Sequence, residues 1–91
     1  MICKNFKEKE KMRNAGRSAA TILDRLCRMV RPGMSTLEID EAGGEMMRDF
    51  RVKSACKGYR SGNRVFPSFT CLSINDEVVH GIGMPDRILK D

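Results

Sequence analysis

One long helical pattern occupies the first third of the chain. Between Glu8 and Arg31, apolar residues recur every three or four positions, a spacing that puts them on one face of an α-helix. The stripe consists of Met12, Ala15, Ala19, Ile22 or Leu23, Leu26, and Met29 or Val30. An Arg-Pro-Gly sequence follows, and it ends the helix because proline disfavours a helical residue before it and glycine permits a turn. The sequence therefore predicts a long amphipathic helix from about Glu8 to Arg31.

A second helix is predicted directly after this turn. Ser35 can cap its N-terminus while Glu38, three residues on, can return to the Ser35 amide, which is a capping box. One apolar stripe then continues through Ile39, Ala42, Met46 and Phe50. The glycine pair at 43–44 weakens the middle of this helix without ending it.

From Arg51 the pattern changes to that of strands and turns. Residues 51–59 indicate a short strand that opens into a polar, glycine-containing loop at 57–67. Residues 68–74 are rich in β-formers, Asn75 and Asp76 supply a turn, and residues 77–82 are expected to pair back as a further strand. The predicted fold class is α+β, with two helices followed by antiparallel strands in a single unit.

Charge and cysteine spacing narrow the protein classes. The net charge of +5 would suit nucleic acid, a ribosome surface or acidic lipid. Over residues 7–11, however, glutamates alternate with the lysines and no aromatic residue does, which favours a solvated helix face. The four cysteines form no C-x-x-C pair, so neither a zinc module nor a disulfide scaffold is indicated. No stretch reaches the roughly 18 apolar residues of a membrane span, and no signal segment is visible, so we expect a cytoplasmic protein with reduced thiols.

The single histidine, His80, has two cysteines as candidate partners. Cys71 lies nine residues before it across the predicted hairpin, and Cys56 lies in the first predicted strand. A cysteine–histidine dyad would need an electropositive setting that strand cysteines lack, so the alternative is that both are small core residues. A metal site needs three or four ligands, which these residues do not provide.

The loop before the hairpin suggests a pocket. It brings Tyr59, Phe66 and the two thiols toward the segment that carries His80. Apolar walls with one polar group would suit a long, uncharged, flexible side chain. The alternative is an ordinary loop packed over a sheet.

Nearly the whole chain resembles the N-terminal part of a type I methionine aminopeptidase. The matching segments are "EKMRNAGRSAA", "RPGMSTLEID", "SACKGY", "FPSFTCLSINDEVVHGI" and "DRILKD", in family order and near family spacing. The resemblance implies that residues 1–91 are the N-terminal part of one pita-bread catalytic domain. It also implies that the protein removes the initiator methionine from nascent polypeptides. The N-termini of those polypeptides would then be its partners, and the ribosome is a further candidate. No direct nucleic-acid function and no membrane partner are expected.

The resemblance also assigns roles to individual residues. His80 falls on the family's "HGI" histidine, which hydrogen-bonds the substrate near the scissile amide. Cys56, Tyr59, Phe66 and Cys71 would line the methionine pocket, where sulfur and aromatic walls suit a thioether. In the complete family enzyme two divalent ions (Co, Mn, Fe or Zn) hold a bridging hydroxide that attacks the scissile carbonyl.

Two departures qualify this comparison. The loop from Tyr59 to Phe66 is longer than the common pattern and Arg60 stands where many members have histidine, so contacts beyond the first substrate residue stay open. The family's five metal ligands lie further along than Asp91, so we expect this chain alone to bind no metal pair and to hydrolyse no peptide. The alternative function is a non-catalytic pita-bread relative that binds ribosomes or RNA.

Overall fold

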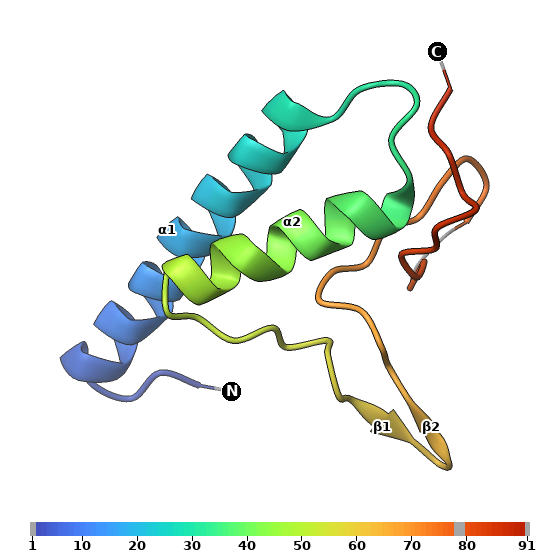
Figure 1. Cartoon of the computed structure of the whole chain (residues 1–91). Coiled ribbons are helices and arrows are strands. Elements are labelled where there is room, and N and C mark those ends of the chain that lie inside the picture. Colours follow the sequence, from blue (N-terminus) through green and yellow to red (C-terminus); the bar gives the residue numbers. More distant parts are fainter. Residues whose placement is uncertain (1, 78–79, 91) are drawn as a thin grey trace.

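A computed structural model describes residues 2–77 and 80–90 of the chain. The elements are helix α1 (Phe6–Met29), helix α2 (Thr36–Asp49) and the antiparallel strands β1 (Arg60–Ser61) and β2 (Arg64–Val65). The two helices lie side by side and the short hairpin projects away from them (Figure 1). The predicted order, two helices followed by antiparallel strands, is confirmed, but the described residues contain one short hairpin where three strands were expected.

Helix α1 begins two residues earlier and ends two residues earlier than expected. The Asn5 side chain accepts a hydrogen bond from the Glu8 N–H (2.9 Å), which caps the first turn. Val30 after the helix is extended, so the helix has already ended two residues before Pro32. Of the predicted stripe, Ile22 and Leu26 are buried, whereas Met12 is half exposed, so only the second half of the stripe faces the core.

Helix α2 follows the predicted pattern closely. Ser35 Oγ accepts from the Glu38 N–H at 3.1 Å, which is one of the two hydrogen bonds of the predicted capping box. Ile39 is buried against Ile22 and Leu26 of α1, and Ala42, Met46 and Phe50 pack around this core.

The glycine pair in α2 has a packing role that the sequence did not indicate. A Cβ on Gly44 would lie 2.6 Å from the Phe69 ring, and a Cβ on Gly43 would lie 3.1 Å from the Thr70 methyl. Both glycines are therefore the surface on which residues 69–70 rest, and this explains why a helix interior tolerates them.

The end of the chain returns to the start of α2. Ile88 pairs with Ser35 in an antiparallel bridge, and the Leu89 N–H donates to the Met34 carbonyl (2.8 Å). The Thr36 N–H, which has no partner within the helix, donates to the Arg87 carbonyl (2.9 Å). The C-terminal segment thus completes the hydrogen bonding of a helix start.

The predicted positions of the strands were wrong. The hairpin forms at 60–65, inside the predicted loop, and the described residues of 51–59, 68–74 and 77–82 are otherwise outside strands. The reason is clearest at Phe69 and Thr70, whose N–H groups donate to the Asp40 carboxylate instead of a neighbouring strand. The third predicted strand includes residues 78 and 79, which lie outside the described residues.

The predicted turn at Asn75 and Asp76 is present. The Glu77 N–H donates to the Ile74 carbonyl across it (3.1 Å), and Asn75 takes a left-handed conformation with φ of 56°. Beyond it the chain runs back, so that the Leu72 N–H reaches the Gly81 carbonyl (2.9 Å). Within residues 2–77 and 80–90, neither helix combines the length and the apolarity that crossing a bilayer requires.

Candidate substrate pocket

The structure brings all five predicted site residues into one neighbourhood. The Cys56 and Cys71 sulfurs lie 3.7 Å apart, and the Cys71 sulfur lies 3.7 Å from His80 Nδ1. The Phe66 ring meets the His80 ring edge-on, with 6.3 Å between centroids and 70° between planes. Tyr59 joins the group through the Phe66 N–H, which donates to the Tyr59 carbonyl (2.9 Å).

An open groove of about 710 Å3 lies beside His80. We call it the aromatic groove; its lining is Tyr59, Ser61, Arg64, Val65, Phe66, Pro67, His80 and Ile82. Apolar side chains dominate this lining, and the imidazole is exposed at it. Such a surface suits an apolar side chain that carries a polar group at one end.

The two thiols do not line the aromatic groove that the rings of Tyr59, Phe66 and His80 line. Cys56 lines a separate hollow of about 410 Å3 beneath α1, together with apolar residues that include Ile22, Leu26 and Phe69. Cys71 connects that hollow to the aromatic groove, because its sulfur contacts both Cys56 and His80. The residues predicted to line one pocket therefore lie around two neighbouring spaces, with the thiols at their junction.

A buried carboxylate positions the Cys71 segment. Asp40 on α2 is 4% exposed and accepts three hydrogen bonds, from the Phe69 N–H (3.1 Å), the Thr70 N–H (2.8 Å) and the Thr70 hydroxyl (2.6 Å). Hydrogen bonds to a charged group are stronger than neutral ones. They attach the residues immediately before Cys71 to the helix.

One hydroxyl organises the Cys56 turn in a similar way. Ser54 Oγ donates to the Phe69 carbonyl (2.5 Å) and accepts from the N–H groups of Cys56 and Lys57, both at 3.1 Å. Since Phe69 is itself held by Asp40, the backbones that carry the two thiols are joined through a short polar network.

His80 sits in a constrained backbone. Its φ of 59° is left-handed, which is uncommon for a non-glycine residue. The next residue is fixed from both sides, because the Gly81 N–H donates to Ser73 Oγ (3.2 Å) and its carbonyl accepts from Leu72. A Cβ at Gly81 would lie 1.9 Å from the Leu72 carbonyl oxygen, so only glycine fits there.

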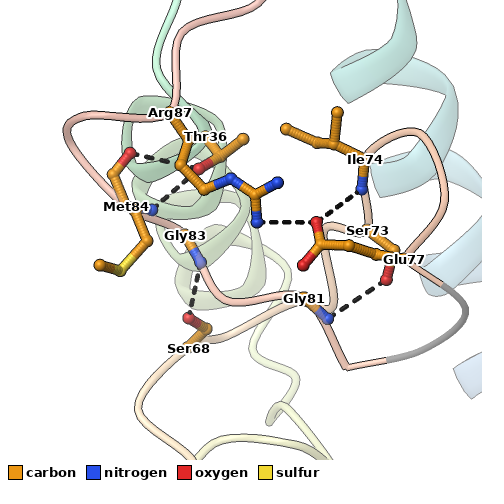
Figure 2. A network of polar contacts seen from close by, with 9 residues as sticks. All are labelled: Thr36, Ser68, Ser73, Ile74, Glu77, Gly81, Gly83, Met84 and Arg87. Carbon is orange, nitrogen blue, oxygen red and sulfur yellow. Dashed lines mark hydrogen bonds and ion pairs between the residues drawn. The ribbon is translucent and has the colours of Figure 1, made fainter.

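A wider polar network holds the segment after His80 (Figure 2). Ser68 Oγ accepts from the Gly83 N–H (3.1 Å), and the Thr36 hydroxyl accepts from the Met84 N–H (2.8 Å). On the other side of the turn, Glu77 accepts from the Arg87 guanidinium at 2.7 Å and from the Ile74 N–H at 2.9 Å. The histidine is therefore anchored to α2 and to the chain end.

The electrostatics keep the central thiol neutral. Partial desolvation, and then the hydrogen bond and charge of the neighbouring Cys56, raise the pKa of the Cys71 thiol above its ordinary value. A protonated thiol is a poor nucleophile, so the cysteine–histidine pair has the geometry of a dyad without its activation. The Arg87 guanidinium, followed by the Ile74 N–H, lowers the pKa of Glu77, which keeps that contact ionic.

The residues present do not form a metal centre. Among residues 2–77 and 80–90, no three histidine, cysteine, aspartate or glutamate side chains are grouped so that they could hold an ion. The carboxylate that is buried, Asp40, has its oxygens occupied by the donors of residues 69 and 70.

Residues 10–91 match the model of metallopeptidase family M24. The chain belongs to this family. Similar proteins include methionine aminopeptidase B of Synechocystis sp., 39% identical over the whole of this chain and 34% of its own length. The methionine aminopeptidase of Escherichia coli is 41% identical over 90% of this chain and 30% of its own length.

A solved M24 structure supports the same relationship at the level of the fold. The crystal structure of methionine aminopeptidase from Thermotoga maritima superimposes with a TM-score of 0.87 and 35% identity, covering all of this chain and 35% of that one. The observed helices and hairpin are therefore those of part of a methionine aminopeptidase fold, as predicted. The chain spans about a third of the length of the relatives it matches.

Sequence reasoning missed the residues that hold the site. Asp40, Ser54, Ser68 and Ser73 were not singled out, although they fix the backbone around the thiols and His80. The available signal was Asp40, which shares a helical face with the glycine pair three and four residues on. In this helix the two glycines leave room for residues 69–70 to approach, and the Asp40 carboxylate accepts from their N–H groups.

Proposed function

We propose that this chain is the substrate-recognising, N-terminal part of the single catalytic domain of a metal-dependent aminopeptidase that removes the initiator methionine from nascent proteins. Membership of M24 and likeness to methionine aminopeptidases over nearly the whole chain support the proposal. The observation that carries it is the convergence of two aromatic rings, two thiols and the exposed imidazole. The substrates would be the N-termini of nascent polypeptides.

The aromatic groove and the adjoining thiols suit a thioether side chain. Sulfur–aromatic contacts contribute about 0.3–1.5 kcal/mol each, and Tyr59 and Phe66 offer rings in the lining of the groove. The Cys56 and Cys71 sulfurs add polarizable surface. A positively charged side chain would lose its hydration there without gaining an ionic partner, because the charged residue in the groove lining, Arg64, is itself a cation.

His80 would contact the substrate peptide group. The Cys71 thiol, kept protonated, can donate to His80 Nδ1 at 3.7 Å, which leaves the ring hydrogen on Nε2. Nε2 could then donate to a substrate carbonyl oxygen or amide at the groove. This assigns to Cys71 two functions, a share of the pocket wall and selection of the imidazole tautomer.

The divalent metals of an M24 enzyme would be held by residues outside this chain. The described residues offer no ligand group for them. When bound, such a metal pair would supply the activated hydroxide. The part proposed for this chain is to bind the methionine side chain and orient the peptide bond.

A chimera tests the proposal. The corresponding 30% of the Escherichia coli methionine aminopeptidase would be replaced with this chain, and methionine release from a Met-Ala-Ser peptide would be measured. We expect a chimera with normal metal content to release methionine and to lose most of its kcat/KM on Phe66→Ala. A chimera that folds and loads metal but releases none would refute the proposal and favour a non-catalytic relative.

A further inference from the structure

Two free thiols face each other at the junction of the two spaces. Cys56 and Cys71 are separated by 15 positions in sequence, and their sulfurs lie 3.7 Å apart. Cys71 is exposed and Cys56 is partly so, which makes both accessible to a small oxidant. We propose that this pair is a reversible modification site, a dithiol that a hydroperoxide converts into an intramolecular disulfide.

The geometry requires only a short movement of the sulfurs. A disulfide places its sulfurs about 2.05 Å apart, so the two sulfurs, now 3.7 Å apart, must approach by roughly 1.6 Å. Neither cysteine lies in a strand whose pairing would resist a small backbone adjustment. The contacts of Ser54 and Asp40 with the adjacent backbone keep the two segments together while the side chains turn.

The reaction has two balanced steps. The Cys56 sulfur attacks the hydroperoxide, the O–O bond breaks, and Cys56 becomes a sulfenic acid while an alcohol or water leaves. The Cys71 thiol, unreactive while it keeps its proton, passes that proton to His80 Nδ1 and attacks the sulfenic sulfur, and the hydroxide that leaves takes up the proton and departs as water. His80 Nδ1, 3.7 Å from the Cys71 sulfur, can carry this proton between the two.

The order of the steps follows from the surroundings of the thiols. Cys71 contacts a base and a second sulfur, so it is placed to act in the second step, the resolution of an oxidised Cys56. In a Cys71→Ser variant the sulfenic acid on Cys56 should therefore persist and react with dimedone.

The experiment uses the chain with Cys3→Ser and Cys27→Ser, so that two of its four thiols remain. After brief treatment with dilute hydrogen peroxide, we expect the monomer to lose two hydrogens in its intact mass and to lose both alkylatable thiols. A peptide digest should contain the segments of Cys56 and Cys71 joined, and dithiothreitol should restore both thiols.

The matched control keeps Cys3 and Cys27 and carries Cys56→Ser and Cys71→Ser. Cys27 lies in the last turns of α1 and Cys3 precedes it, so the helix puts on the order of 30 Å between them. We expect the monomeric control to form no internal disulfide. The chain that keeps Cys56 and Cys71 should form its disulfide at least tenfold faster when folded in buffer than when unfolded in concentrated urea. Two persistent thiols in the oxidised monomer, or equal rates in urea and buffer, would overturn the proposal.

Discussion

Replacing Asp40 with alanine should destabilise the chain more than any exposed acidic substitution. The change removes the acceptor of two backbone N–H groups, those of Phe69 and Thr70, and of the Thr70 hydroxyl. An orphaned buried donor costs about 1–3 kcal/mol, and the hydroxyl can turn to water. Because Phe69 and Thr70 are half-buried, we expect a loss of about 2–4 kcal/mol.

This loss is a large share of the total free energy of unfolding. At about 0.05–0.15 kcal/mol per residue, a chain of 91 residues has a total stability of about 5–14 kcal/mol. The free energy of unfolding would be measured by urea titration with far-UV circular dichroism. Glu41→Ala on the exposed side of the same helix is the control and should change stability by less than about 0.5 kcal/mol.

Amide hydrogen exchange localises the effect. Asp40→Ala should increase exchange most at Phe69 and Thr70, while Asp40→Asn, which keeps one acceptor oxygen, should recover part of the stability. If Asp40→Ala were as stable as Glu41→Ala, or if these amides exchanged no faster, the argument that this carboxylate anchors the site segment would fail.

Three further outcomes are expected. Gly44→Ala forces its Cβ against the Phe69 ring and should cost about 1–3 kcal/mol, whereas Gly16→Ala meets nothing within 4 Å and should gain about 0.5–1 kcal/mol in the same urea titration. Since the pKa of Glu77 is lowered by Arg87, the stability it contributes is present above its unfolded pKa of about 4.3 and is lost as pH falls through the lower folded value. Glu77→Gln should therefore flatten the acid side of a plot of urea midpoint against pH, and an unchanged slope would contradict the ion pair. The chain alone, supplied with cobalt or manganese, should release no methionine from Met-Ala-Ser, and measurable release would show that the metal ligands lie within it.

The helices were predictable because their signals are local. The period of apolar residues, the Ser35 cap and the Arg-Pro-Gly break act within a few positions, and each was found close to its expected place. Met12, which is half exposed, shows the limit of reading the apolar period. The period shows which face of a helix is apolar, but not how much of that face the rest of the protein buries.

The strands were not predictable in position because they depend on partners far along the chain. Residues 68–74 have β-forming composition, yet Asp40, about 30 positions earlier, captures the N–H groups of Phe69 and Thr70. Instead, a hairpin whose strands have two residues each forms around Gly62, whose φ of 63° suits a tight turn. Composition alone does not show which acceptor an N–H will find.

The members of the candidate site could be named from the sequence, but the residues that hold their backbone in place could not. The resemblance to methionine aminopeptidases pointed to Cys56, Cys71 and His80, and the fold brings them within contact of one another. The hydroxyls and the carboxylate that hold these segments act through side chain to backbone contacts, which leave no periodic pattern in a sequence.

The most direct test of the account is His80→Ala in the chimera, with metal content and turnover measured on the same sample. If His80 donates to the substrate and is not a metal ligand, the variant should keep its metal stoichiometry while kcat falls by on the order of a hundredfold or more, as for loss of a proton donor. Loss of metal together with activity would make the imidazole a ligand, and unchanged turnover would remove it from the reaction; either result would contradict the account.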